Sequence, residues 1–122
     1  MMIKIVIGGQ MGKDEIKKSL IKLIGDRDVE ITVKNDLDAA MAIQNGESDY
    51  YIGACETGAG GALAMATALL GSDKTVTVAS PSKVLSEEEV ADEINNKGKI
   101  AFGFTINTKD TVLPILVKYL VK

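Results

Sequence analysis

Five short apolar runs alternate along the chain with five segments of helical periodicity. Within residues 14–24, Ile16, Leu20 and Ile24 recur at helical spacing, whereas residues 29–33 alternate as a half-buried strand does. The predicted strands are 3–7, 29–33, 50–54, 75–79 and 100–105, and the predicted helices are 14–24, 36–44, 58–70, 87–96 and 110–121. This alternation predicts right-handed βαβ crossovers, and hence a three-layer α/β domain in which helices cover both faces of a five-stranded parallel sheet.

Two of the predicted helices begin at residues suited to capping. Asn35 or Asp36 can accept a hydrogen bond from the first turn of the helix at 36–44. Ser86 and Glu89 stand three residues apart at the start of the helix at 87–96, which is the spacing of a capping box. These caps predict where the loops before the two helices end.

Composition bounds the class of protein. The chain of 122 residues is 46% hydrophobic and 25% charged, so we expect one folded domain over residues 1–122. The net charge of −3 offers no basic stripe for a phosphate backbone, and we expect no nucleic-acid partner. No apolar run reaches the length of a membrane span, and no signal peptide precedes the first strand, so we expect a cytoplasmic protein without membrane insertion.

The chain contains no histidine and one cysteine, Cys55. This composition excludes a Ser–His or Cys–His nucleophile pair and a His-ligated metal within one chain. Acid–base chemistry would fall to Asp, Glu, Lys, Cys or Tyr. We therefore predict no metal and no cofactor.

The unusual residues of the chain gather where the predicted strands end. Ligands of parallel sheets bind beyond the carboxyl ends of the strands, at the point where the strand order reverses. The candidate ligand-binding residues at these ends are Gly8, Gly9, Gln10, Asn35, Asp36, Cys55, Glu56, Thr57, Gly58, Gly60, Gly61, Ser80 and Ser82. We expect a small anionic metabolite as their ligand.

The loop at residues 55–61 carries the chemistry that points to an anion. Its glycines let backbone N–H groups approach a ligand, and they lead into a helix N-terminus, which favours negative charge. Cys55 and Glu56 are the candidate catalytic residues, since a helix N-terminus lowers the pKa of a thiol. Glu56 would repel an anion and suits a hydroxyl or an amine. The alternative is that the glycines serve tight packing and that Cys55 is a small buried apolar residue.

Residues 62–70 form a segment without any charge. A helix that is apolar on every side is buried all round, but a sheet covers one side of it. The other side must meet a neighbouring helix or a second subunit. We therefore predict a homo-oligomer, most simply a two-fold dimer through residues 62–70.

Two segments resemble the family of ribose-5-phosphate isomerase B and galactose-6-phosphate isomerase. The first strand and loop follow that family's outline, and Cys55, Thr57, Gly58 and Gly60 match its third loop. The resemblance implies a flavodoxin-like, Rossmann-like sheet of order 2-1-3-4-5, a phosphorylated sugar or similar anion across the first and third loops, and a proton-transferring Cys55. Gln10 and Met11 replace an Asp-His pair of that family, Glu56 replaces a glycine, and Ala66 replaces an asparagine.

A second resemblance covers nearly the whole chain. Residues 34–71 and the run KIAFGF at 99–104 are similar to a YhfU-like family of small bacterial proteins of unknown function. Genes of that family often neighbour genes for a multi-spanning membrane protein and for metabolic enzymes. The resemblance implies a role in uptake or metabolism of a small molecule, with a membrane transporter or an enzyme as partner.

Three functions remain open at this stage. The first is a binding or accessory module that holds a small anionic metabolite for a transporter or enzyme. The second is an isomerase or epimerase with Cys55 as base and Glu56 or Asp36 as the second group. The third is a phosphocarrier on Cys55, although the carriers of that type place their cysteine after the first strand.

Overall fold

The computed structural model describes residues 2–56 and 61–121, and the predicted alternation of strands and helices is confirmed there. The strands are β1 (Ile3–Gly9), β2 (Val29–Val33), β3 (Tyr50–Cys55), β4 (Thr75–Ala79) and β5 (Ala101–Thr105). The helices are α1 (Lys13–Ile24), α2 (Asp36–Gln44), α3 (Ala64–Leu70), α4 (Glu87–Asn95) and α5 (Lys109–Leu120). Two short 3-10 turns, η1 (Gly61–Leu63) and η2 (Ile106–Thr108), precede α3 and α5.

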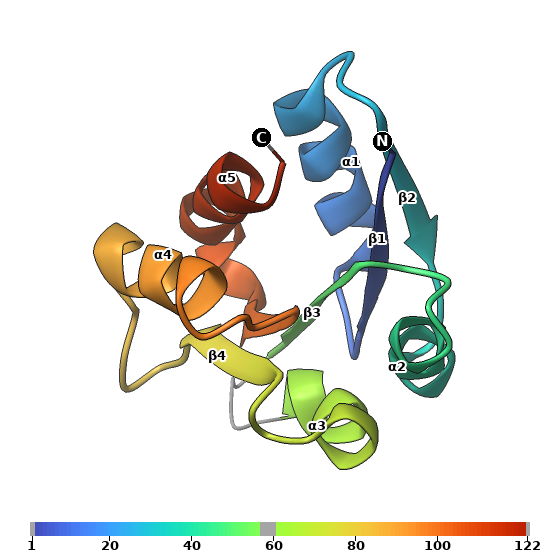
Figure 1. The fold of residues 1–122 in the computed structure, drawn as a ribbon. Helices are drawn as coiled ribbons and strands as arrows, with labels where there is room; N and C mark the ends of the chain where they lie inside the picture. Colours follow the sequence, from blue (N-terminus) through green and yellow to red (C-terminus); the bar gives the residue numbers. More distant parts are fainter. Residues whose placement is uncertain (1, 57–60, 122) are drawn as a thin grey trace.

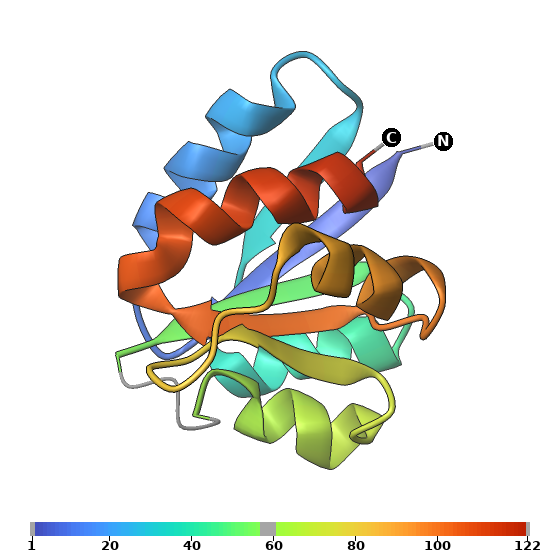
Figure 2. The ribbon, with the colours of Figure 1, turned by 90° about the vertical axis from the view of Figure 1, so that its left-hand side faces the viewer.

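The five strands form one parallel sheet of order β2-β1-β3-β5-β4 between two layers of helices. Helices α1, α4 and α5 cover one face, and α2 and α3 cover the other (Figure 1). The start of β1 and the end of α5 lie together at one end of the sheet (Figure 2). The three-layer, Rossmann-like α/β class is therefore confirmed.

The predicted strand order 2-1-3-4-5 is wrong, because β5 and β4 exchange places. All five residues of β5 are buried, and Phe102 and Phe104 reach the main core. In contrast, Thr75 and Val76 of β4 are half-buried and Thr77 is exposed. The more apolar strand takes the interior position, since an interior strand is covered on both faces and paired along both edges.

Local capping follows the sequence. Asn35 caps α2, since its side-chain oxygen accepts a hydrogen bond from the backbone N–H of Asp38 at 2.8 Å. The capping box of Ser86 and Glu89 at α4 is confirmed. Of the helix predicted at 58–70, residues 61–63 form the 3-10 turn η1 and residues 64–70 form α3, and its expected start at residue 58 lies outside the described residues.

Two apolar clusters form the core, one on each face of the sheet. The larger cluster joins β1, β3 and β5 to α1, α4 and α5, and includes Ile5, Ile7, Leu20, Ile52, Phe102, Phe104, Leu113 and Leu116. The smaller cluster lies under α2 and α3, and includes Val6, Ala39, Ala40, Ile43, Tyr51, Leu63 and Ala66. The small alanines of this second cluster let α2 and α3 approach the sheet closely.

The close approach is tightest at Gly8, near the carboxyl end of β1. A methyl group added to Gly8 would lie 2.7 Å from Cβ of Ala39 and 2.6 Å from Cε2 of Tyr51. Both distances are shorter than van der Waals contact. Gly8 therefore allows the first turns of α2 to pack directly on the end of β1.

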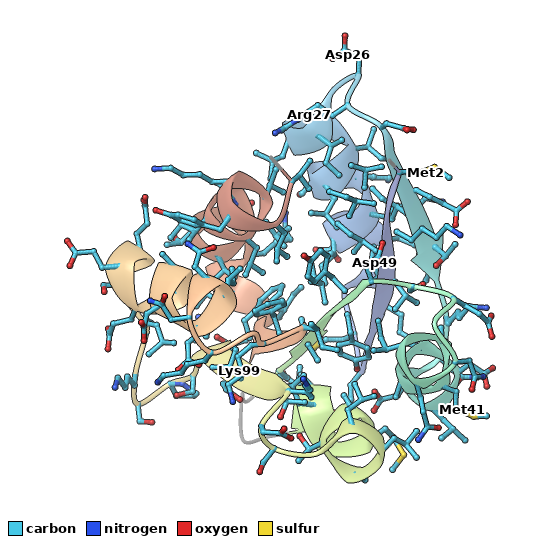
Figure 3. The ribbon with its side chains drawn as sticks, in the orientation of Figure 1. Met2, Asp26, Arg27, Met41, Asp49 and Lys99 are labelled. Carbon is cyan, nitrogen blue, oxygen red and sulfur yellow. The ribbon has the colours of Figure 1, made fainter. Side chains whose placement is uncertain are left out.

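The outer surface of the α2–α3 layer carries exposed apolar side chains beside the polar Asp38 and Gln44 of α2. Met65 on α3 is 38% exposed, and Leu37 and Met41 on α2 are 47% and 41% exposed. Met41 lies on the outer side of α2 (Figure 3). This surface agrees with the expectation that the uncharged segment meets a second subunit, and the dimer stays a prediction. No helix of the described residues is long and apolar enough to cross a membrane.

Hydrogen exchange distinguishes the two strand orders. We expect every interior amide of β5 to exchange slowly, because β3 and β4 pair with it on both sides. Amides of residues 75–77 that point away from β5 should exchange faster than those of β5, because β4 is an edge strand and no strand of the described residues accepts a hydrogen bond from them. NMR measures the exchange rate of each amide. If all amides within β4 exchanged slowly and alternate amides of β5 exchanged fast, the result would favour the order 2-1-3-4-5.

Candidate functional site

The connections after β1 and β3 leave the sheet toward opposite faces. β1 continues into α1 on one face, and β3 continues toward η1 and α3 on the other. Adjacent parallel strands whose connections diverge in this way leave a crevice at their carboxyl ends, where ligands of such sheets bind. These carboxyl ends lie at the end of the sheet opposite the start of β1 (Figure 2).

A buried tyrosine, Tyr51 of β3, joins three chain segments at this crevice. Its hydroxyl donates to Oδ1 of Asp36 at 2.6 Å and lies 2.8 Å from the carbonyl oxygen of Ala62. The backbone N–H of Gly9 donates to the same hydroxyl at 2.8 Å. Tyr51 thereby connects the end of β1, the first turn of α2 and η1, the 3-10 turn that precedes α3.

The environment of Tyr51 keeps its hydroxyl protonated. Burial raises the pKa of Tyr51 well above its ordinary value, and the hydrogen bond to Asp36 and the charge of Asp36 raise the pKa further. A protonated hydroxyl carries one hydrogen, which faces two acceptors, Asp36 and the Ala62 carbonyl. The shorter distance to the carboxylate identifies Asp36 as the main acceptor.

The loop after β1 folds over the end of β3. The backbone N–H of Gln10 donates to the carbonyl oxygen of Ala54 at 2.9 Å, and Gly9 adopts a φ of +77° that suits glycine. The amide of the exposed Gln10 side chain lies against Gly61, since a methyl group on Gly61 would be 2.9 Å from its Oε1. The structure thus brings part of the predicted site together.

We call this cluster, which lies at the carboxyl ends of the neighbouring interior strands β1 and β3, the β1–β3 edge. It comprises Gly9, Gln10, Asp36, Gly61 and Ala62 around the Tyr51 hydroxyl. Gln10 presents an amide that can donate and accept, and Asp36 presents a half-buried carboxylate. Together they suit a small polar ligand.

The two candidate catalytic residues differ in exposure. Cys55 is 2% exposed, and it pairs in register with Thr105 of β5, which is also buried. Glu56 follows directly and is exposed. Thr57, Gly58 and Gly60 lie outside the described residues. A buried thiol at the last residue of a strand is the packing arrangement weighed from the sequence.

Ser80 and Ser82 lie in a separate turn at the end of β4. The hydroxyl oxygens of the two serines are 3.2 Å apart, and the backbone N–H of Lys83 donates to Oγ of Ser80 at 3.2 Å. Strand β5 stands between this turn and β3. The corrected strand order therefore puts the loop after β5, with Thr105 and Thr108, next to Cys55 in place of the two serines.

Sequence reasoning missed Tyr51 as a member of the site. The signal was present, because Tyr51 alternates with Tyr50 and Ile52 along β3 and so faces the other side of the sheet. A buried tyrosine hydroxyl nearly always has a hydrogen-bond partner. Its partners could not be named, since positions 9, 36 and 62 are far apart in the chain.

A separate depression of about 690 Å³ lies at the opposite end of the sheet. Met2, Lys4, Asp49, Tyr50 and Ile100 are among the residues that line it, and Met2 and Asp49 are marked in Figure 3. The Asp49 carboxylate already accepts a hydrogen bond from the backbone N–H of Lys4 at 2.8 Å. This depression also lies at the amino ends of the strands, away from the crevice.

Comparison with known proteins agrees with the fold. The family model described as "Protein of unknown function DUF2620" matches residues 3–120. The "Uncharacterized protein YhfU" of Escherichia coli strain K12 is 39% identical over 119 residues, which cover 98% of this chain and 99% of that protein, and YhfU of Shigella flexneri gives the same values. The crystal structure of ribose-5-phosphate isomerase B from Giardia lamblia matches with a TM-score of 0.70 and 18% identity, over 98% of this chain and 88% of that chain. At this identity the likeness shows the fold alone.

Replacement of Tyr51 by phenylalanine tests its structural role. We expect Tyr51→Phe to lower the free energy of unfolding by about 1–3 kcal/mol, because Gly9 loses its acceptor and Asp36 its donor. The matched control is Tyr50→Phe, since no hydrogen bond of the Tyr50 hydroxyl is found among the described residues, and it should change stability by about 0.5 kcal/mol or less. Equal effects of the two variants in urea denaturation would contradict this role.

The same variant gives a prediction for alkaline pH. The folded chain holds the Tyr51 proton more tightly than the unfolded chain, whose tyrosine has the ordinary pKa of 10.0. The resulting stabilisation is fully present below pH 10 and is lost as the pH rises above 10. The difference in stability between the wild type and Tyr51→Phe should therefore shrink from about pH 9 to about pH 11. A constant difference across this range would argue against a raised pKa.

Proposed function

The chain belongs to the DUF2620 family of proteins of unknown function, and we propose that it is a binding or accessory module for a small metabolite that carries a phosphate or carboxylate group. The ligand would bind at the β1–β3 edge. The membership also confirms the similarity to the YhfU-like proteins.

One observation carries this proposal: Gln10 bridges the two diverging connections at the crevice. Its backbone is bonded to Ala54 of β3, and its exposed amide lies against Gly61 at the start of η1. A side-chain amide held in this way can donate to an oxygen of a phosphate or carboxylate. The position matches the place where ligands of open parallel sheets bind.

A positively charged side chain, Lys13, lies at the same end of the sheet. Lys13 is the first residue of α1, and its ammonium donates to the carbonyl oxygen of Lys34 at 3.2 Å. No ion pair of Lys13 is found within residues 2–56 and 61–121, so its charge is not neutralised by a carboxylate there. This supports an anionic group on the ligand.

The burial of Cys55 favours binding over thiol catalysis. An isomerase or epimerase would need the Cys55 sulfur in contact with the substrate, and a phosphocarrier would need it in contact with a donor. With 2% of the residue exposed, neither contact is available without movement of the chain. The fold shared with ribose-5-phosphate isomerase B suggests such activity by analogy alone, so the isomerase remains the second candidate.

The binding module would act with a partner. Bound ligand at an exposed edge can be presented to a membrane transporter or to an enzyme, and the exposed Gln10 and Glu56 lie at that edge. The net charge of −3 offers no attraction to nucleic acid. A cytoplasmic location fits this role.

Calorimetric titration with a panel of phosphate-bearing and carboxylate-bearing metabolites tests the proposed function. We expect at least one member to bind the wild type, and Gln10→Ala to weaken that binding about tenfold, or about 1.4 kcal/mol. Gln44→Ala is the matched control, because Gln44 is the other glutamine of the chain and lies at the far end of α2, and it should leave binding unchanged. Absence of binding to every member would remove the proposal.

Alkylation of Cys55 separates the binding module from the thiol enzyme. We expect iodoacetamide to label the folded chain at least tenfold more slowly than the urea-unfolded chain, because the residue is buried. Mass spectrometry follows the labelling, and the single cysteine makes the readout unambiguous. Fast labelling of the folded chain that a ligand suppresses would instead favour the isomerase.

A further inference from the structure

The Asp36 carboxylate is held in a fixed orientation at the β1–β3 edge. Its Oδ1 accepts the 2.6 Å hydrogen bond from the Tyr51 hydroxyl, and Tyr51 is fully buried. A rigid, buried donor restricts the position of the carboxylate oxygen that it contacts. Positioning of this kind is typical of groups that contact a ligand.

Helix α2 does not need Asp36 as a cap. Asn35 fills that role through the backbone N–H of Asp38, and its amide also donates to Oδ2 of Asp38 at 3.0 Å. Asp36 is half-buried, and no second hydrogen-bond partner of its carboxylate is found among the described residues. A carboxylate can accept about four hydrogen bonds, so Asp36 retains most of its capacity as an acceptor.

Asp36 and Gln10 flank the same point. Gly9 precedes Gln10, and its backbone N–H donates to the Tyr51 hydroxyl. The Gln10 side chain lies against Gly61, and the carbonyl oxygen of the next residue, Ala62, lies 2.8 Å from the same hydroxyl. The Tyr51 hydroxyl therefore lies 2.6 Å from Oδ1 of Asp36, and 2.8 Å from both the Gly9 nitrogen and the Ala62 carbonyl oxygen. A ligand held by Gln10 would have the Asp36 carboxylate close by.

A fixed carboxylate beside an anion site repels a ligand that brings negative charge alone. Two like charges a few ångströms apart at a partly buried site repel more strongly than they would in bulk water. A ligand that adds a hydroxyl or an ammonium group turns this repulsion into a charge-assisted hydrogen bond. The carboxylate would thus select among anions.

Resting on the proposed function, we propose that Asp36 accepts a hydrogen bond from a hydroxyl or ammonium group of the ligand. The ligand class is then a small molecule that carries such a donor group beside its phosphate or carboxylate. The juxtaposition of the anchored Asp36 and the exposed Gln10 carries this inference. Asp36 discriminates between ligands, and Gln10 holds the anionic group.

The test uses six probes in two matched sets. Methyl phosphate, glycerol 3-phosphate and phosphoethanolamine form one set, used at about pH 8 where each phosphate monoester is a dianion without a hydrogen, and acetate, glycolate and glycine form the other. We expect the wild type to bind the hydroxyl or the ammonium member of at least one set at least tenfold more tightly than the member without a donor. NMR titration measures the six dissociation constants, and the comparison within the wild type does not depend on any variant.

Two variants then assign the preference to Asp36. Asp36→Asn should reduce the preference at least tenfold, and its amide oxygen can still accept from Tyr51, which preserves the fold. Asp38→Asn is the matched control, because it removes a carboxylate two residues away that is already bonded to Asn35, and it should leave the preference intact. A larger loss for phosphoethanolamine and glycine identifies an ammonium ligand, and a larger loss for glycerol 3-phosphate and glycolate identifies a hydroxyl ligand.

The outcomes separate this inference from the proposed function. If all members of both sets bind the wild type equally, or if Asp36→Asn keeps the full preference, the role of Asp36 is overturned and anion binding stands. If no probe of either set binds the wild type, the inference is overturned, and the wider metabolite panel decides on the proposed function. A preference that both variants abolish would also overturn the assignment to Asp36.

Discussion

The hydrogen bond from Tyr51 to Asp36 is the interaction on which the carboxyl end of the sheet depends. Together with the Gly9 amide and the Ala62 carbonyl, it connects segments that leave the sheet toward opposite faces. Burial makes the connection strong, because an unpaired hydroxyl or carboxylate in this place would lose its hydration without compensation. The same bond positions Asp36, the carboxylate that we propose selects the ligand.

Local features of the fold could be predicted from the sequence, and the strand order could not. The cap at Asn35 and the capping box at Ser86 follow from residues within one turn of each other. The exchange of β4 and β5 depends on which strand buries more apolar surface in the assembled sheet. The sequences TVTVA and AFGFT of the two strands are consistent with the observed order, but they do not by themselves determine which strand pairs with β3.

The candidate site was predicted in part for the same reason. The sequence located Gln10, Asp36 and Gly61 near strand ends, and the structure joins them through Tyr51, whose partners come from three distant segments. Ser80 and Ser82 also lie at a strand end, but β5 separates their turn from β3. Among the described residues, the amide of Gln10 and the carboxylate of Asp36 are the polar groups on which the proposed binding role rests, and Lys13 and Glu56 lie at the same end of the sheet.

Amide chemical-shift mapping by NMR tests most directly whether this chain binds a ligand at the β1–β3 edge, as we propose. Titration with the tightest-binding phosphate or carboxylate probe should shift the amides of Gly9, Gln10, Asp36 and Gly61, because these residues surround the Tyr51 hydroxyl. The amides that line the depression at the amino ends of the strands should stay unchanged. Shifts confined to that depression, around Lys4 and Asp49, would contradict the claim.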